Sequence, residues 1–156
     1  MGSVRGGTIV MRKEDASMST SDFILRPIGH VESPLRDRAA APKQGYEGAP
    51  AAWLVFDPAI RDALRDLQVG EEVIVLTWLD RSQRDILRVH PRSDRSQPKR
   101  GVFSTRSPDR PNPIGLHRVK IISMADPLRI EVEPLEALHL TPIIDLKPVL
   151  EDVSDA

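Results

Sequence analysis

Residues 101–115 read GVFSTRSPDRPNPIG, and this stretch is the most informative segment of the chain. Its three prolines and two glycines stiffen the backbone, because proline locks φ and pushes the residue before it toward extended geometry. The stretch also carries Arg106, Arg110 and Asn112, whose side chains present hydrogen bonds. A plain proline-rich surface turn is the simpler interpretation. The two arginines and the asparagine together favour a rigid polar loop that binds a partner.

Short apolar segments on both sides of this loop predict β-strands. They cover 23–32, 51–56, 72–79, 116–124, 128–132 and 141–150, and Arg88–Val89 begins another. Pro27 indicates an edge position or a bend in the first of them. Asp57 and Pro58 open the one clear helix, which Gly70 ends. Many short strands, 14 prolines and one helix predict a mainly β fold, an antiparallel barrel or sandwich.

The length and composition indicate one domain with a real core. A chain of 156 residues can bury one, and the absence of cysteine excludes disulfides and thiolate metal sites, which fits a reducing cytoplasm. No apolar run approaches the roughly 20 residues of a membrane helix. Residues 1–22 mix glycine, serine and charge without the apolar core of a signal peptide. We therefore expect a flexible N-terminal tail over 1–22 and the folded domain over 23–156.

The charges are segregated along the chain. Residues 81–120 hold 11 of the 22 Lys and Arg but only 3 of the 23 Asp and Glu, although the formal net charge of the whole chain is −1. A basic face of this kind can hold the phosphates of an anionic partner. Alternatively, these arginines pair with the acidic remainder across the fold. Charge alone does not separate the two interpretations.

The familiar motifs of several enzyme classes are missing from the sequence. It contains neither GxGxxG nor GxxxxGK[ST], which argues against a nucleotide site of the usual α/β kind. The four histidines, His30, His90, His117 and His139, lack the spacing of a metal site, so we expect no metal. Each is interpreted as a surface or core histidine, except that His139 lies at a loop-to-strand junction. A Ser-His-Asp triad has no GxSxG elbow to support it.

Four segments together resemble the TsaA/TrmO family, also called YaeB-like proteins. Residues 101–115 are similar to its signature G-V-F-A-T-R-S-x-x-R-P-N-P-I-G, with Ser104 where alanine is usual. Residues 141–148, TPIIDLKP, resemble the end of its second signature, D-G-T-P-V-x-D-I-K-P. Residues 27–34 match the opening I-G-x-I-x-S-P, and 42–44 resemble P-R-Q. The order and rough spacing agree over about residues 23–150.

The resemblance implies a small single-sheeted antiparallel β-barrel with one or two short helices. It also implies binding of S-adenosylmethionine, usually by a homodimer with the cofactor near the subunit interface, and methylation of N6 of a threonylcarbamoylated adenosine beside the tRNA anticodon. The family's cofactor contacts would fall here on Gln44, Gly45, Asp80, Arg81, Arg106, Leu116, Glu136, Ala137, Leu138 and His139. We expect Asn112 to help shape the same pocket.

Two departures from the family affect the expected chemistry. Asp80 stands where the family usually has histidine, and His139–Leu140 replace Asp-Gly. Either Asp80 or His139 could accept the proton of an attacking amine. For tRNA phosphates the candidates are Arg88, Arg92, Lys99 and Arg100. The departures leave two alternatives open, namely an S-adenosylmethionine-binding or RNA-binding module without transferase activity, and a methyltransferase with another substrate.

Overall fold

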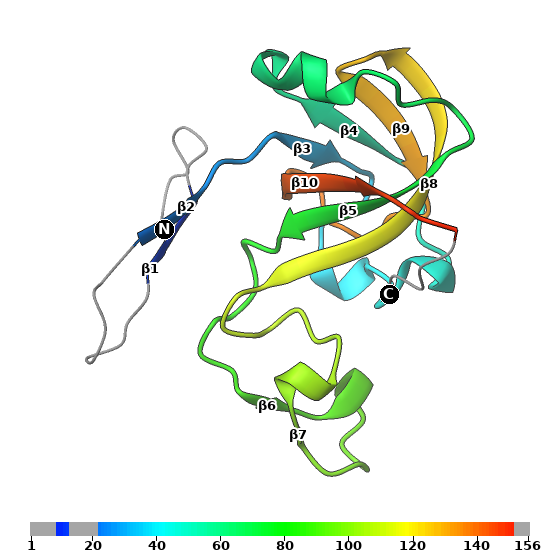
Figure 1. Ribbon diagram of the computed structural model, residues 1–156. Helices are drawn as coiled ribbons and strands as arrows, with labels where there is room; N and C mark the ends of the chain where they lie inside the picture. The colour runs from blue at the N-terminus through cyan, green and yellow to red at the C-terminus, as the bar shows by residue number, and fades with distance from the viewer. Residues whose placement is uncertain (1–8, 13–21, 152–156) are drawn as a thin grey trace.

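Six antiparallel strands close into a barrel in the order β10-β3-β4-β9-β8-β5 (Figure 1). The computed structural model describes residues 9–12 and 22–151. The barrel strands are β3 (Gly29–Glu32), β4 (Ala52–Phe56), β5 (Glu72–Trp78), β8 (Ile114–Asp126), β9 (Arg129–Glu133) and β10 (Pro142–Pro148). The prediction of a mainly β, antiparallel barrel is confirmed.

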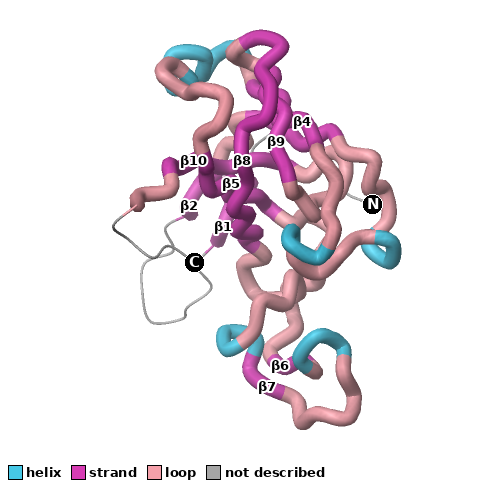
Figure 2. The backbone as a smooth tube through the Cα atoms, turned by 90° about the vertical axis from the view of Figure 1, so that its right-hand side faces the viewer, coloured by secondary structure: helices cyan, strands magenta, loops and turns pink. Residues whose placement is uncertain are grey.

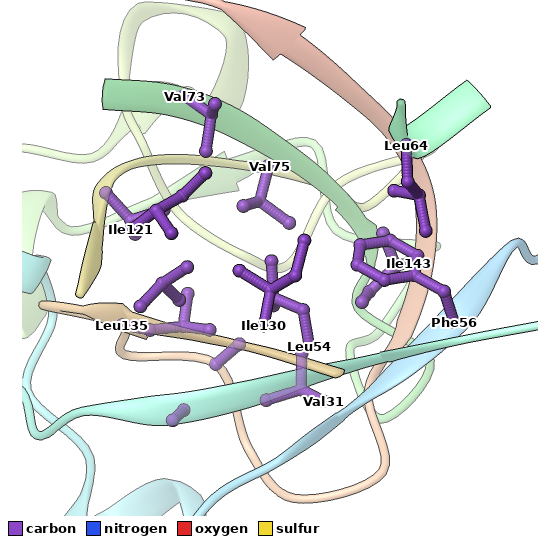
Figure 3. Close-up of a cluster of buried hydrophobic side chains, with 14 residues drawn as sticks. Val31, Leu54, Phe56, Leu64, Val73, Val75, Ile121, Ile130, Leu135 and Ile143 are labelled. Atoms are coloured by element: carbon purple, nitrogen blue, oxygen red, sulfur yellow. The ribbon is translucent and has the colours of Figure 1, made fainter. Parts of the chain in front are cut away.

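The barrel core comes from the alternation of side chains along each strand. In β4, Ala52, Leu54 and Phe56 are buried while the residues between them are partly exposed. This period of two places one side of every strand in the interior. Figure 3 shows the resulting cluster, in which residues such as Leu54, Ile130 and Ile143 have no exposed surface. The core therefore fills the barrel and leaves its outer face and ends for other contacts.

The predicted helix is present, but it is a short 3₁₀ helix, η3 (Pro58–Leu64). It begins as expected, because the Asp57 carboxylate accepts a hydrogen bond of 2.8 Å from the N–H of Ala59. It ends well before Gly70, whose N–H donates instead to the carbonyl of Ile121 and whose φ is +99°. Gly70 thus leads the chain into β5 rather than capping the helix. Leu64 anchors the helix in the core.

The predicted first strand is divided in two at Pro27. Before it lies β2 (Asp22–Leu25), which pairs with β1 (Ile9–Arg12) in a separate two-stranded sheet, and after it β3 enters the barrel. Proline lacks the N–H that a continuous ladder requires, which accounts for the break. The predicted flexible tail falls mostly on residues 1–8 and 13–21, which lie outside the described residues.

Residues 79–113 form an excursion between β5 and β8, which we call the β6–β7 excursion. It contains β6 (Arg88–Val89) paired with β7 (Arg100–Gly101), and it projects from one end of the barrel (Figures 1 and 2). Two 3₁₀ helices, η4 (Pro91–Ser93) and η5 (Val102–Ser104), complete it. The other two, η1 (Arg38–Ala40) and η2 (Gly45–Glu47), lie between β3 and β4. None of the described helices is long and apolar enough to cross a membrane.

Candidate functional site

A pocket of about 460 Å³ opens beside β5 and β8. Its volume lies in the range of small-molecule sites. Five of the residues predicted to bind a cofactor line it, namely Gln44, Gly45, Arg106, Leu116 and Glu136. The remaining lining residues are Tyr46, Glu72, Ile74, His117, Arg118 and Pro134. The fold thus brings together residues from five separate parts of the sequence.

The pocket walls combine apolar surface with opposite charges. Ile74 and Leu116 supply apolar surface from β5 and β8, and the Tyr46 ring is 79% exposed at η2. Glu72 and Arg118 neutralise each other, because a guanidinium nitrogen of Arg118 lies 2.6 Å from the Glu72 carboxylate.

Arg106 is the other cation of the pocket, and among the described residues no acid pairs with it. Glu136 supplies a carboxylate. A zwitterionic ligand with an apolar body would complement this lining.

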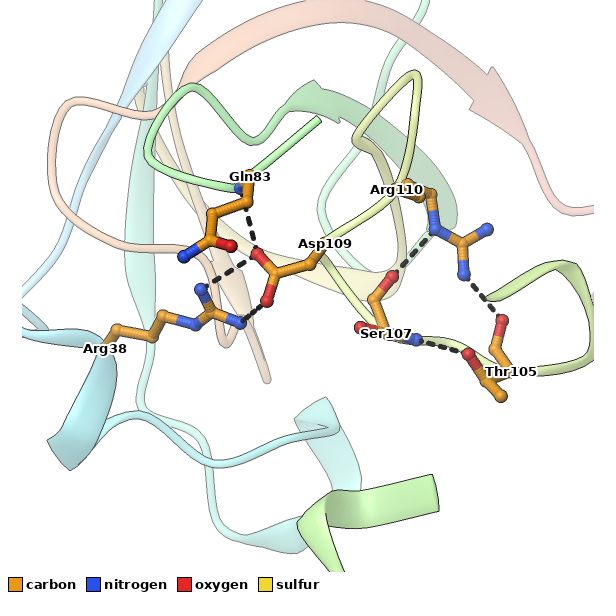
Figure 4. Close-up of polar contacts among 6 residues, drawn as sticks. All are labelled: Arg38, Gln83, Thr105, Ser107, Asp109 and Arg110. Carbon is orange, nitrogen blue, oxygen red and sulfur yellow. Dashed lines mark hydrogen bonds and ion pairs between the residues drawn. The ribbon is translucent and has the colours of Figure 1, made fainter. Parts of the chain in front are cut away.

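The proline-rich loop is held together by Arg110. Its guanidinium donates to the carbonyls of Val102, Thr105 and Ser107 at 3.0, 2.6 and 2.7 Å. The Thr105 hydroxyl also accepts from the N–H of Ser107 (Figure 4). The two arginines of the predicted binding loop therefore have different roles. Arg110 satisfies the loop's own backbone, while Arg106 is exposed at the pocket.

Asp109 ties the same loop to the rest of the protein. Its carboxylate accepts two hydrogen bonds from Arg38, at 3.0 and 2.9 Å, and one from the N–H of Gln83 at 2.9 Å (Figure 4). Burial opposes ionisation of this carboxyl, but the hydrogen bonds outweigh it and lower the pKa of Asp109. The loop is thereby fixed relative to η1 before any ligand binds.

Asn112, which we expected to help shape the pocket, contacts Arg84. Its side-chain oxygen accepts from Arg84 at 3.0 Å, and Arg84 also donates to the carbonyl of Pro111 at 2.7 Å. The Arg84 guanidinium stacks 5.2 Å from the centre of the Trp78 ring. Asn112 does not line the pocket, so its predicted contribution to the pocket's shape stays a prediction.

The other predicted cofactor contacts, Asp80, Arg81, Ala137, Leu138 and His139, also lie outside the pocket lining. Ala137 belongs to the core. Arg81 joins two segments, because its guanidinium donates to the carbonyls of Arg36 and His139 at 3.0 and 3.1 Å. Arg81 and His139 therefore form a second polar group near the end of β3.

Asp80 and His139, the two candidate bases, have shifted pKa values. Desolvation by surrounding protein raises the pKa of Asp80, although the residue keeps contact with solvent. Burial, followed by the positive charge of Arg36, lowers the pKa of His139. The His139 Nδ1 accepts a hydrogen bond of 3.2 Å from the N–H of Ser33. A neutral ring with Nδ1 as acceptor carries its proton on Nε2.

The pKa of His139 predicts a pH-dependent stability. The unfolded chain binds this proton near pH 6.5, while the folded protein binds it only at lower pH, so the unfolded state holds more protons between the two values. The free energy of unfolding should therefore fall as the pH drops below about 6.5. In His139→Asn, which can still accept from Ser33 but does not titrate, urea denaturation from pH 7.5 to 5 should show a shallower fall. An unchanged slope in the variant would contradict this assignment.

The sequence did not indicate the polar chain formed by Thr77, His117 and Glu136. The Thr77 hydroxyl lies 2.7 Å from Nε2 of His117, and Nδ1 of His117 lies 2.7 Å from the Glu136 carboxylate. Thr77 and His117 are buried. The sequence alone favours an ordinary surface or core histidine at position 117. The available signal was its inward-facing position in β8, because a buried polar side chain requires partners.

Gly115 makes this polar chain possible. It pairs directly opposite Thr77 and precedes His117 by two residues, so all three lie on one side of the β5–β8 ladder. A Cβ at position 115 would lie 2.3 Å from the Thr77 hydroxyl and 2.5 Å from His117 Nε2. Only a residue without a side chain fits between them.

The four predicted RNA-binding residues all lie on the β6–β7 excursion. Arg92 forms an ion pair with Glu47, and its carbonyl accepts from Lys43. Among the described residues, no acidic side chain pairs with Arg88, Lys99 or Arg100, and all three are exposed. The described part of the chain also holds no group of His, Cys, Asp or Glu that could bind a metal ion.

Comparison with known protein families gives one matching model. The tRNA-methyltransferase O N-terminal domain matches residues 30–155. A protein of Methanothermobacter thermautotrophicus named "Probable S-adenosyl-L-methionine-binding protein" is 42% identical over 87% of this chain and 96% of its own length. An Archaeoglobus fulgidus protein named "S-adenosyl-L-methionine-binding protein" is 43% identical over 80% of this chain and 88% of its own.

Among solved structures, the barrel is similar to TrmO from Pseudomonas aeruginosa. One crystal structure superposes with a TM-score of 0.66 and 27% identity, covering 92% of this chain. A second gives a TM-score of 0.64 and 26% identity over 89% of this chain. The chain spans about 62% of the length of the first TrmO chain and 61% of the second.

Proposed function

The chain belongs to the tRNA-methyltransferase O N-terminal domain family, and we propose that it is a methyltransferase that binds S-adenosyl-L-methionine in the pocket beside β5 and β8. Family membership and the names of the two archaeal relatives support the cofactor. The observation that carries the proposal is that Gln44, Gly45, Arg106, Leu116 and Glu136 all line one pocket.

The residues of the pocket suit this cofactor chemically. S-adenosylmethionine combines a carboxylate, an ammonium group, a sulfonium centre and an aromatic base. Arg106 would hold the carboxylate, Glu136 the cationic part, and the exposed Tyr46 ring offers a surface for the base. Ile74 and Leu116 would contact the apolar portion.

When bound, S-adenosylmethionine supplies an activated methyl group on sulfur. The chain's own residues then have to orient the acceptor and receive its proton, and positioning alone can lower the barrier by roughly 7–11 kcal/mol. Asp80 is the better of the two proposed bases, since its raised pKa makes its carboxylate a stronger proton acceptor. His139 is less suited, because its Nδ1 is occupied and its Nε2 carries the proton in the neutral ring.

We propose tRNA as the acceptor, and specifically N6 of a threonylcarbamoylated adenosine beside the anticodon. The family and the exposed basic residues of the β6–β7 excursion support this substrate. A homodimer with the cofactor near its interface, as the resemblance implies, belongs to the same proposal, and sedimentation equilibrium would measure it.

Calorimetry followed by a transfer assay tests the proposed function. Titration with S-adenosylmethionine should give heat that saturates at one molecule per chain. Radiolabelled methyl groups should then enter bulk tRNA, with the label on the threonylcarbamoylated adenosine after nuclease digestion. Binding without transfer to any acceptor would contradict the enzyme, and label found only in another acceptor would contradict the tRNA substrate.

Exposed cations on the excursion predict a measurable salt dependence. Arg88→Ala, Lys99→Ala and Arg100→Ala should each weaken tRNA binding and reduce the slope of log affinity against log salt concentration by about one contact. Filter binding of tRNA at KCl concentrations from about 50 to about 300 mM measures this slope. Arg61→Ala, on η3 of the barrel, is the matched control and should keep the wild-type slope. Unchanged slopes in the three variants would contradict phosphate contacts.

A second candidate function is an S-adenosylmethionine-binding module without transferase activity. The archaeal relatives, which this chain covers almost completely, are named for binding alone. The proposed bases also lie outside the pocket lining. The transfer assay separates this candidate from the enzyme.

A further inference from the structure

We propose that His117 is a positioning residue, which hydrogen-bonds Glu136 through one ring nitrogen and Thr77 through the other and so holds the Glu136 carboxylate ready for the cationic part of the cofactor. This inference rests on the proposed function, because it assigns a role to residues of the same pocket.

Burial and distance support the arrangement. The Thr77 side chain is fully buried, and the side chains of His117 and Glu136 are 5% and 16% exposed. Both ring nitrogens of His117 have partners at 2.7 Å. No buried side-chain nitrogen or oxygen among the described residues lacks a hydrogen-bond partner. The three side chains therefore form a satisfied network that ends at the pocket.

The charges assign the direction of each hydrogen bond. An ionised Glu136 carboxylate can only accept, so Nδ1 of His117 must carry a hydrogen and donate to it. In the neutral ring, Nε2 is then an acceptor and receives the Thr77 hydroxyl. Glu136 thereby selects the tautomer, and the Thr77 hydroxyl, which can donate or accept, completes it by donating to Nε2.

The same order of hydroxyl, imidazole and carboxylate occurs in hydrolases, where the hydroxyl is the nucleophile. Thr77 does not fit that role. Its side chain has no exposed surface, and the backbone of Gly115 covers its hydroxyl so closely that a Cβ there would lie 2.3 Å away. A substrate carbonyl has no access to the Thr77 oxygen, so the network works toward Glu136 instead.

The second carboxylate oxygen of Glu136 lies near η2, because a Cβ added at Gly45 would stand 3.1 Å from it. The hydrogen bond from His117 to the first oxygen restricts the glutamate side chain before the ligand arrives. Preorganisation of this kind increases affinity, since less entropy is lost on binding.

Two amide substitutions separate this role from a merely structural one. In His117→Asn, the amide nitrogen can take the place of Nδ1 and donate to Glu136, but it does not reach Thr77. In His117→Gln, the longer amide can reach Thr77 but leaves Glu136 without its donor. Calorimetry should show S-adenosylmethionine affinity within about threefold of wild type for Asn and about tenfold or more weaker for Gln.

Controls and a second readout keep the test decisive. His30→Gln removes an exposed histidine from another His–Glu pair, with atoms 3.7 Å apart, and should bind as wild type. Thermal unfolding reports whether each variant folds, and Thr77→Val offers a further route if Gln does not fold, with an expected loss of a few-fold in affinity. In the free wild-type protein, ¹⁵N NMR of the imidazole should show hydrogen on Nδ1.

The outcomes distinguish this inference from the proposed function. The positioning role would be overturned, with the cofactor site left intact, if both His117 variants bound S-adenosylmethionine as wild type does. It would also be overturned if both variants lost affinity equally and in proportion to their loss of stability. An imidazole of His117 that is protonated on Nε2 and unprotonated on Nδ1 would also overturn the positioning role. If the wild-type protein binds no S-adenosylmethionine, the proposed function fails and this inference fails with it.

Discussion

Gly115→Ala is expected to lower the free energy of unfolding by about 2–4 kcal/mol, because the added methyl group enters the polar network. The added Cβ would lie 2.3 Å from the Thr77 hydroxyl and 2.5 Å from Nε2 of His117. Either the β5–β8 ladder moves apart or the hydrogen bond between Thr77 and His117 breaks and leaves buried polar atoms unsatisfied. Urea denaturation at pH 7 measures the loss, and S-adenosylmethionine binding by the folded fraction should weaken with it.

Gly101→Ala is the matched control for this substitution. It adds the same methyl group at the other end of the proline-rich stretch, where a Cβ would meet nothing within 4 Å. Its backbone φ of −58° suits alanine. The free energy of unfolding should stay within about 0.5 kcal/mol of wild type. Equal stabilities for the two variants would contradict the close approach at Gly115.

Arg106→Ala is expected to weaken S-adenosylmethionine binding by about ten- to hundredfold with little change in stability. Arg106 is exposed and lines the pocket, and no acid pairs with it among the described residues. Its removal therefore costs few internal contacts but takes away the proposed partner of the ligand's carboxylate. Arg106→Lys keeps the positive charge but loses the bidentate hydrogen bonds of a guanidinium. Its affinity for S-adenosylmethionine should therefore lie between those of wild type and Arg106→Ala. Calorimetry measures all three affinities.

Arg95→Ala is the control for the Arg106 substitution. It removes another exposed arginine of the β6–β7 excursion, one that does not line the pocket. Its affinity for the cofactor should equal that of wild type. If Arg95→Ala weakens binding as much as Arg106→Ala does, the effect is a general one of net charge and the specific contact is disproved.

Much of the barrel was predictable, because the apolar alternation of its strands is local. The segment 51–56 was predicted as a strand and holds β4. Pro27 was expected to mark an edge position or a bend, and the structure instead divides the segment into two strands there. The helix at Pro58 was predicted from its cap but not its 3₁₀ geometry. Leu64 packs into the core and the N–H of Gly70 donates to Ile121, and neither of these long-range contacts is visible in the local sequence.

The pocket was predictable only in part. The family resemblance named five of its lining residues, including Arg106 and Glu136. Without the resemblance, the loop's residues do not separate Arg106 from Arg110, because which arginine binds the loop's carbonyls is decided by the folded loop. His117 was missed since its two partners lie 40 and 19 residues away.

A titration of the ¹⁵N-labelled protein with S-adenosylmethionine, followed by backbone amide NMR, would locate the cofactor site residue by residue. If S-adenosylmethionine binds in the pocket beside β5 and β8, the largest shifts should fall on Gln44, Gly45, Arg106, Leu116 and Glu136, with smaller shifts elsewhere on the barrel. A spectrum that does not change, or whose changes lie away from these residues, would contradict it.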